Sequence, residues 1–411
     1  MSKFYQISTP TQELFDNKVE LLPSVTELFE FELAYLEYKT LNPKEYIERA
    51  AYAKLFEGKE TLHFLRYSEI PEEVSKNRTS TANFYFKNGL FSTGYATHSL
   101  FPYRGKFHPQ LIKGLINILG IKKGETILDP MSGSGTTNVE AALMGIHSYA
   151  IDVSPFCRFM TKTKYDALKI NLDIFNEIEL DEDKLFDFFS QRNIIKKIEK
   201  IDIDKRKIYE LSLLAYLDAL GYSKRVVRSN HRQLFSKVLK RYIETVKGLL
   251  SNQYFNNDGL GNVTILEKSD ALNIELPDKS IDGIITSPPY SFAIDYVEND
   301  KDQLEYLGYD TEKLKNKLIG LKGKTKSEKL ENYFNDMDKF LSEASRVLKK
   351  NKYLVVIIGS NTNQTGGIRL EQSVVSSAQK YNMSLVKSIL KPIKGMRNTM
   401  KEEYILIFER K

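Results

Sequence analysis

The chain has 411 residues, of which 28% are charged and 41% hydrophobic, and its formal net charge is +6. No apolar run reaches the length of a membrane span, the N-terminus lacks a signal-peptide core, and the single cysteine, Cys157, excludes an intramolecular disulfide and a cysteine-based zinc cluster. These features predict a globular cytoplasmic protein with one large domain and smaller modules, whose mild basicity is compatible with nucleic acid binding.

The first 95 residues match no motif and are treated as an N-terminal extension of unknown role. Within them, residues 25–36 have the pattern of an amphipathic helix whose acidic face is either solvated or docked on another module. Residues 83–86, Asn-Phe-Tyr-Phe, are rich in aromatic side chains and suit a strand or a docking patch. Residues 101–106 contain proline and glycine and predict a loop, which leads into a helix from Pro109 to Leu119.

Residues 125–137 predict a short strand followed by a glycine-rich turn, and residues 138–144 predict the helix after it. Gly133 and Gly135 would let the backbone approach a ligand where a Cβ would clash, although glycines at these places also suit tight strand–helix packing. A P-loop lysine is absent, so the turn favours a nucleoside with a charged amino-acid tail over a phosphate. Residues 148–152 predict a second strand that ends in Asp152, a carboxylate able to accept both ribose hydroxyls.

Residues 161–261 interrupt this alternation of strands and helices with a long, charged, helical stretch. A helix start is expected at Ser229-Asn230. Arg225, Arg228 and Arg232 share one helical face, which predicts either a path for DNA phosphates or a solvated basic surface. The insertion is therefore a candidate target-recognition region.

Strands resume at residues 262–266, 281–285 and 353–358, a helix covers residues 331–350, and residues 385–390 with 403–408 predict a closing hairpin. The strand at 281–285 runs into Thr-Ser-Pro-Pro-Tyr, where two prolines without N–H groups must end the ladder. The carboxyl end of such a strand is where open α/β sheets hold ligands. A hydroxyl, a stiff carbonyl and a flat ring suit a nucleobase with an exocyclic amine; in isolation the same residues could form only a turn.

Taken together, these motifs resemble those of the S-adenosylmethionine-dependent amino-methyltransferases of DNA, which act on N4 of cytosine or N6 of adenine. The resemblance rests on Asp129-Pro-x-x-Gly-Ser-Gly-Thr136, Asp152, Ser269-Asp270-Ala271, Thr286-Ser-Pro-Pro-Tyr290 and Phe107-His-Pro-Gln-Leu-Ile112. It implies catalytic roles for Ser287, Pro288, Pro289 and Tyr290. It implies cofactor contacts, with S-adenosylmethionine as the cofactor, for Phe107, His108, Pro109, Asp129, Pro130, Ser132, Gly133, Gly135, Thr136, Asp152, Asp270 and Ala271.

The resemblance also implies a fold. We expect a doubly wound, mostly parallel α/β sheet of the seven-stranded class I methyltransferase type, with a C-terminal antiparallel hairpin. Residues 96–160 and 262–411 would form this catalytic domain, with residues 161–261 inserted and residues 1–95 appended. Family members usually place target recognition between the cofactor and catalytic halves or after them, so an insertion before Ser269 departs from that arrangement. A second lysine-rich segment, with Lys322 and Lys324, is a further candidate for DNA contact.

Ser287 guides the choice of base, because the adenine enzymes of the family usually carry Asp or Asn at that place. The sequence therefore favours N4-methylation of cytosine in double-stranded DNA, with the target base flipped out of the duplex. The expected setting is a restriction-modification or related defence system, with a cognate endonuclease as a candidate partner. N6-adenine methylation, RNA base methylation and an inactive nucleic-acid-binding subunit remain alternatives. The five histidines have no metal-ligand spacing, so no metal site is expected, and Cys157 is expected to be an inert buried thiol.

Overall fold

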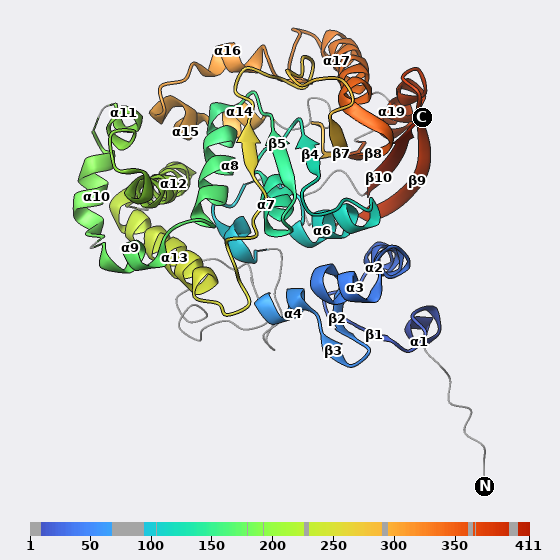
Figure 1. The fold of residues 1–411 in the computed structure, drawn as a ribbon. Helices are drawn as coiled ribbons and strands as arrows, with labels where there is room; N and C mark the ends of the chain where they lie inside the picture. The colour runs from blue at the N-terminus through green and yellow to red at the C-terminus, as the bar shows by residue number, and fades with distance from the viewer. Residues whose placement is uncertain are drawn as a thin grey trace.

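The computed structural model describes residues 10–67, 94–103, 105–178, 180–191, 193–225, 230–289, 295–360, 365, 367–393 and 402–411. The aromatic stretch at residues 83–86, for which a strand or docking patch was predicted, lies outside these ranges. Figure 1 shows a central sheet with the helical insertion at the left of the view and the N-terminal elements below the sheet. Among the described helices, none is both long and apolar enough to cross a membrane.

The central sheet has seven strands in the order β6-β5-β4-β7-β8-β10-β9. The first five are parallel, whereas β10 runs antiparallel to both of its neighbours. The strands are β4 (Thr126–Asp129), β5 (His147–Ala150), β6 (Val263–Ile265), β7 (Ile281–Thr286), β8 (Leu348–Gly359), β9 (Met383–Pro392) and β10 (Glu402–Arg410). This order confirms the predicted mostly parallel sheet with a C-terminal antiparallel hairpin.

Helices cover both faces of the sheet, which explains why apolar residues on both faces of the central strands are buried. Ile284 packs in a cluster with α17 (Lys326–Val347) and α19 (Leu370–Gln379). Its neighbour Ile285 faces the opposite cluster, which includes α6 (Pro109–Ile118). Every residue of β7 is buried. The helices α7 (Thr136–Leu143) and α8 (Pro155–Ala167) follow the strands β4 and β5. The core therefore holds the carboxyl ends of β4, β5 and β7 in fixed register.

The N-terminal elements form a small module around a three-stranded sheet in the order β1-β2-β3. They are α1 (Pro10–Leu14), β1 (Val19–Leu21), α2 (Leu28–Thr40), α3 (Pro43–Arg49), β2 (Ala53–Phe56), β3 (Lys59–Glu60) and α4 (Leu62–Tyr67). The helix predicted at residues 25–36 is thus present but begins three residues later, after a capping box between Glu27 and Glu30. Its acidic Glu37 is fully buried, so part of the acidic face docks on the rest of the chain.

Helix α6 joins this module to the core through polar side chains. Gln110 donates to the Ala51 carbonyl at 2.9 Å, and Lys113 Nζ lies 2.8 Å from Nδ1 of His63. Asn117 donates to Glu37 Oε1 at 2.6 Å. These three residues recur every three or four positions and so share one face of the helix. Because all three are buried, the N-terminal module covers a specific polar face.

The insertion consists of helices with a hydrophobic cluster of their own. They are α9 (Leu172–Glu177), α10 (Glu182–Phe189), α11 (Ile194–Ile198), α12 (Ile203–Arg225) and α13 (His231–Leu250). Asn230 caps α13 by accepting from the N–H groups of Arg232 and Gln233, as predicted for a helix start at Ser229-Asn230. The cluster extends to α8 and to Val297 and Leu304, which lie in α14 (Tyr296–Asn299) and α15 (Lys301–Tyr306). The segment that follows β7 therefore returns to the insertion before it reaches α16 (Thr311–Lys315) and α17.

Candidate active site

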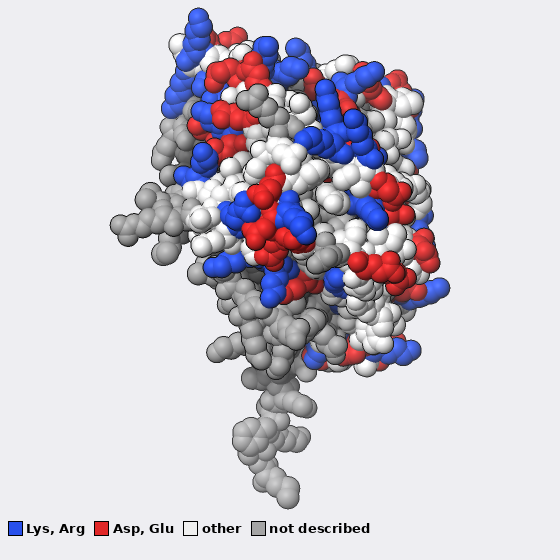
Figure 2. All heavy atoms as spheres, turned by 90° about the vertical axis from the view of Figure 1, so that its left-hand side faces the viewer, with Lys and Arg blue, Asp and Glu red and all other residues white. Residues whose placement is uncertain are grey.

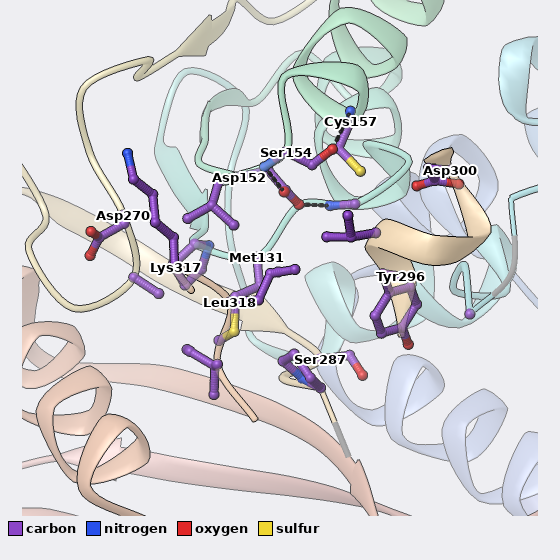
Figure 3. Close-up of a pocket in the computed structure, with 18 of the residues that line it drawn as sticks. Met131, Asp152, Ser154, Cys157, Asp270, Ser287, Tyr296, Asp300, Lys317 and Leu318 are labelled. Atoms are coloured by element: carbon purple, nitrogen blue, oxygen red, sulfur yellow. Dashed lines mark hydrogen bonds between the residues drawn. The ribbon is translucent and has the colours of Figure 1, made fainter. Parts of the chain in front are cut away.

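A pocket opens at the carboxyl ends of β4, β5, β6 and β7 and encloses about 850 Å3 of space, including its mouth. Figure 3 shows Asp270 and Lys317 at one end, Asp152 in the middle, and Ser287 with Tyr296 at the other end. The pocket brings together seven of the residues predicted from sequence, namely Pro130, Gly133, Asp152, Asp270, Ala271, Ser287 and Pro289. Segments separated by more than a hundred residues thus meet at the edge where parallel strands place ligands.

The two glycines of the turn after β4 have different surroundings. Gly135 has φ +75°, and a Cβ there would lie 2.6–2.9 Å from the side chain of Thr161 on α8. Gly133 has φ +48°, lines the pocket, and would place a Cβ no closer than 3.4 Å to Tyr103. Gly135 therefore serves helix packing, whereas a side chain at Gly133 would occupy pocket space. An open turn of this kind fits a bound S-adenosylmethionine.

Asp152 is held in place by backbone N–H groups. Its Oδ2 accepts from the N–H of Gly133 and its Oδ1 from the N–H of Ser154, both at 2.8 Å (Figure 3). Burial raises the pKa of the carboxyl, although both N–H groups favour its charged form. The carboxylate thereby links the glycine turn to the start of α8, and its further lone pairs are available to hydroxyl donors in the pocket.

Asp129 lies behind the glycine turn and does not line the pocket. Its Oδ1 accepts from the Thr286 hydroxyl at 2.8 Å and from the Met131 N–H at 3.2 Å. Burial raises the pKa of Asp129 to about 6, against the effect of the Thr137 and Thr286 hydroxyls. The side chain thus connects the loop after β4 to the loop after β7.

Ser287 follows directly at the end of β7. Its Oγ donates to the carbonyl of Ile357 in β8 at 2.9 Å. A hydroxyl that gives its proton to a carbonyl presents lone pairs to other groups, so this contact orients Ser287 as an acceptor. Pro289 lines the pocket, whereas Pro288 does not. Tyr290, predicted as the stacking ring, lies outside the described residues.

The remaining predicted cofactor residues do not line the pocket. Ser132, Gly135 and Thr136 form the buried side of the glycine turn. Phe107 packs against the cluster on the α6 face of the sheet, His108 precedes α6 as its cap residue, and Pro109 is the first residue of that helix. Burial lowers the pKa of His108 to about 4. A role for Phe107, His108 and Pro109 at the methionine end stays a prediction.

Several pocket residues were not predicted as site residues. Tyr103 and Gly105 come from the loop before α6, and Tyr296 begins α14. The rings of Tyr103 and Tyr296 are stacked, with centroids 6.3 Å apart and planes 16° apart. The segment Lys317, Leu318 and Ile319 covers the end beside Asp270. Cys157, expected to be inert, also lines the pocket, and burial raises the pKa of its thiol. No periodicity marks such loop residues, and only the Pro-Gly composition of 101–106 was a signal.

The predicted DNA contacts are in part engaged within the chain. Arg232 pairs with Asp183 at 2.8 Å and with Asp187, and its guanidinium lies 4.4 Å from the ring centroid of Phe186. Lys322 pairs with the buried Asp336 at 2.8 Å.

The other basic residues predicted to contact DNA are Lys324, Arg225 and Arg228. Lys324 is exposed on the surface. Arg228 and the side chain of Arg225 lie outside the described residues. Figure 2 shows acidic and basic side chains interspersed over the face that carries the insertion. Within the described ranges, no group of three or more His, Cys, Asp or Glu side chains is arranged to hold a metal ion.

Comparisons with known proteins find methyltransferases. Residues 281–411 match a family model described as DNA methylase, and residues 99–209 match one described as RMKL-like, methyltransferase domain. The Type II methyltransferase M.BsoBI of Geobacillus stearothermophilus is 26% identical over 70% of this chain and 68% of its own length. The Type II methyltransferase M.MvaI of Kocuria varians is 24% identical over 74% of this chain and 86% of its own. Among solved structures, TrmN from Thermus thermophilus aligns with 12% identity and a TM-score of 0.35, over 75% of this chain and 50% of that one.

The sheet order and the matched methyltransferase models together identify a class I methyltransferase that uses S-adenosylmethionine. Within that class, the chain belongs to the amino-methyltransferases of DNA.

Proposed function

We propose that this chain methylates N4 of cytosine in double-stranded DNA, with Ser287 and the Pro288 carbonyl as the groups that activate the amine. The observation that carries the proposal is the Ser287 hydroxyl, which belongs to a residue lining the pocket and is oriented as an acceptor by its donation to the Ile357 carbonyl. At this place the adenine enzymes that the chain resembles usually carry Asp or Asn. A hydroxyl suits the cytosine enzymes instead.

The amine needs activation because its lone pair is delocalised into the base. Acceptors on the amino hydrogens draw the nitrogen toward a tetrahedral shape and free the lone pair for attack. Ser287 Oγ and the Pro288 carbonyl would be two such acceptors, in adjacent positions of the sequence, and of the two residues Ser287 lines the pocket. Two prolines keep the loop stiff, so that little entropy is lost on alignment.

The cofactor residues would act by holding and orienting. When bound, S-adenosylmethionine supplies an electrophilic methyl group. Asp270 and Ala271 would contact its adenine, Asp152 its ribose hydroxyls, and the open backbone at Gly133 its methionine end. Asp129 would keep the loops after β4 and β7 together through Thr286. This order along the pocket leaves the end beside Ser287 for the target base (Figure 3).

A base inside a duplex cannot reach such a pocket, so the target cytosine must flip out of the stack. Tyr290, which directly follows the two prolines, would stack on the flipped base. No covalent bond to the base is needed for methylation of an exocyclic amine, which agrees with a catalytic loop without cysteine.

The names of two relatives support a proposal for the biological setting. Both M.BsoBI and M.MvaI carry the name Type II methyltransferase. We extend this to the chain as a role in restriction-modification, in which methylation protects a DNA sequence from a cognate endonuclease.

The test uses purified chain, S-adenosylmethionine with a labelled methyl group and DNA of mixed sequence, followed by mass spectrometry of the nucleosides. We expect N4-methylcytosine. Ser287→Ala should lower kcat strongly while the Kd for the cofactor stays as in wild type. Ser280→Ala is the matched control, because its hydroxyl donates to the Pro277 carbonyl at the other end of β7.

Other products would change the proposal in defined ways. N6-methyladenine would keep the site and replace the base, and labelling of RNA alone would replace the polymer. The carbon-methylated product 5-methylcytosine would overturn the mechanism, because that route needs a cysteine nucleophile. Absence of labelling from every nucleic acid would identify an inactive subunit.

A further inference from the structure

Tyr296 presents a phenol group at the pocket in a fixed position. It is the first residue of α14, six residues after Tyr290, and its ring stacks on that of Tyr103. The backbone of Gly105 packs against its hydroxyl end, where a Cβ would lie 3.0 Å from the Tyr296 oxygen. Contacts on the ring face and at the hydroxyl end leave the side chain little freedom to turn away.

The hydroxyl of Tyr296 has no hydrogen-bond partner within the described part of the chain. Tyr296 is half-buried, and its hydroxyl is not among the fully buried polar atoms that lack a partner, so the hydroxyl is open to the pocket. Burial raises the pKa of Tyr296 to about 12, so the group remains a protonated donor at neutral pH. An oriented O–H donor in a pocket is therefore complementary to an acceptor on a ligand.

The position of Tyr296 indicates which part of the ligand it meets. In Figure 3, Tyr296 and Ser287 lie toward the same end of the pocket, opposite Asp270 and Lys317. In the proposed function the adenosine occupies the far end and the target base the near end. The acceptor that the hydroxyl meets is therefore on the base.

Resting on that proposed function, we infer that Tyr296 is a specificity-determining residue whose hydroxyl donates a hydrogen bond to the ring nitrogen next to the methylated amine. Ser287 and Pro288 accept from the amine while Tyr296 donates to the adjacent nitrogen. Cytosine offers this pattern through its 4-amino group and N3, and adenine through its 6-amino group and N1. Thymine and guanine present the reverse, a carbonyl beside an N–H, and would leave both protein groups unpaired.

The experiment compares wild type with Tyr296→Phe, which keeps the ring and its stacking on Tyr103. Single-turnover methylation is measured on an oligonucleotide with the mapped target site. We expect kcat/KM for DNA to fall about 10- to 100-fold, with the Kd for S-adenosylmethionine and the melting temperature as in wild type. Tyr309→Phe is the matched control, because Tyr309 is exposed and outside the pocket.

A second oligonucleotide carries 3-deazacytosine at the target, or 1-deazaadenine where the product is N6-methyladenine. These bases keep the amine but lack the ring acceptor. Wild type should fall to the level of the variant, and Tyr296→Phe should lose nothing further.

Each other outcome is decisive. Wild-type rates in Tyr296→Phe, or independent losses from the variant and the analogue, would overturn the inference alone. A weaker cofactor affinity in the variant would assign Tyr296 to the cofactor instead. A wild-type chain that methylates no DNA would overturn the proposed function and the inference together.

Discussion

The Thr286 hydroxyl donates to Oδ1 of Asp129 at 2.8 Å, across 157 positions of sequence. Thr286 ends β7, before the two prolines, and Asp129 ends β4, before the glycine turn. The residue that precedes each of the two pocket loops is therefore hydrogen-bonded to the residue that precedes the other loop. Both side chains are fully buried, so the contact belongs to the core and not to the ligand surface.

Thr286→Val should destabilise the fold more at pH 8 than at pH 5. Burial already raises the pKa of Asp129 to about 6, and loss of the hydroxyl raises it further. Below pH 6 the Asp129 carboxyl is protonated, so loss of the Thr286 donor costs little stability. Above pH 6 the buried carboxylate has lost one hydrogen bond, which lowers the free energy of unfolding by about 1–2 kcal/mol. Urea unfolding at the two pH values measures the difference, with the exposed Thr264→Val as control. Equal losses at both pH values would contradict a charged Asp129.

The two glycines of the turn should separate binding from stability. Gly133→Ala places a methyl group in pocket space and should weaken cofactor binding by tenfold or more. Gly135→Ala meets Thr161 and should lower the melting temperature more than Gly133→Ala does, since overpacking adds about 1–3 kcal/mol to the shared backbone strain. Calorimetric titration with S-adenosylmethionine and thermal unfolding of both variants provide the comparison. The assignment fails if Gly133→Ala binds the cofactor as wild type does.

Much of this site could be predicted from the sequence, because the informative residues are local. The apolar run of β7 ends at two prolines, and the glycine turn follows β4 within six residues, so strand ends and ligand loops are visible without the fold. Tyr103, Tyr296 and Lys317 could not be found in this way. Tyr103 and Lys317 lie in two separate loops and Tyr296 begins α14, and only the tertiary fold brings the three to one pocket.

The basic residues show a different limit. Arg232 shares a helical spacing with other arginines, which suggested a phosphate path. Its partners Asp183 and Asp187 come from α10, more than forty residues earlier, and a helix–helix contact decides their pairing. Likewise, the polar side chains of Gln110, Lys113 and Asn117 follow the pattern of a solvent-facing side of a helix. In the structure, the N-terminal module covers them.

Asp152→Ala should weaken S-adenosylmethionine binding by about 1–3 kcal/mol, since ribose hydroxyls would lose their acceptor. The substitution also frees the N–H groups of Gly133 and Ser154, so some loss of stability is expected. Asp152→Asn keeps one acceptor oxygen and should give an intermediate affinity. Calorimetric titration of both variants tests this, with Asp166→Ala as control because Asp166 pairs with Lys162 on the surface of the same helix. An unchanged affinity in both Asp152 variants would remove Asp152 from the cofactor site.

The pairing of charges predicts which basic residues reach DNA. Lys324→Ala should reduce the dependence of log Kd on log salt concentration by about one, as expected for a phosphate contact. Arg232→Ala should leave that slope unchanged, because its charge is engaged by Asp183 and Asp187. Lys322→Ala should act on stability instead, since it leaves Asp336 buried without its partner.

Fluorescence anisotropy of a labelled duplex, titrated at several salt concentrations, gives these slopes. A reduced slope in Arg232→Ala would show that DNA displaces its acidic partners. An unchanged slope in Lys324→Ala would move the DNA path away from the segment before α17.

The N-terminal module should give the fold a second pH dependence through Glu37. Burial raises the pKa of Glu37 to about 7, although Asn117 and the Ala51 N–H favour the charged form. An acid whose pKa is higher in the folded state stabilises the fold at low pH, and that stability is lost as the pH rises from about 4.5 to 7, by at most about 3 kcal/mol. Glu37→Gln cannot ionise, so its free energy of unfolding should exceed that of wild type at pH 8 and not at pH 4.5. Urea unfolding across this range measures the effect, and the exposed Glu48→Gln is the matched control in the same module. If Glu37→Gln is less stable than wild type at every pH, the carboxylate is stabilising and its charged form is the one that α6 binds.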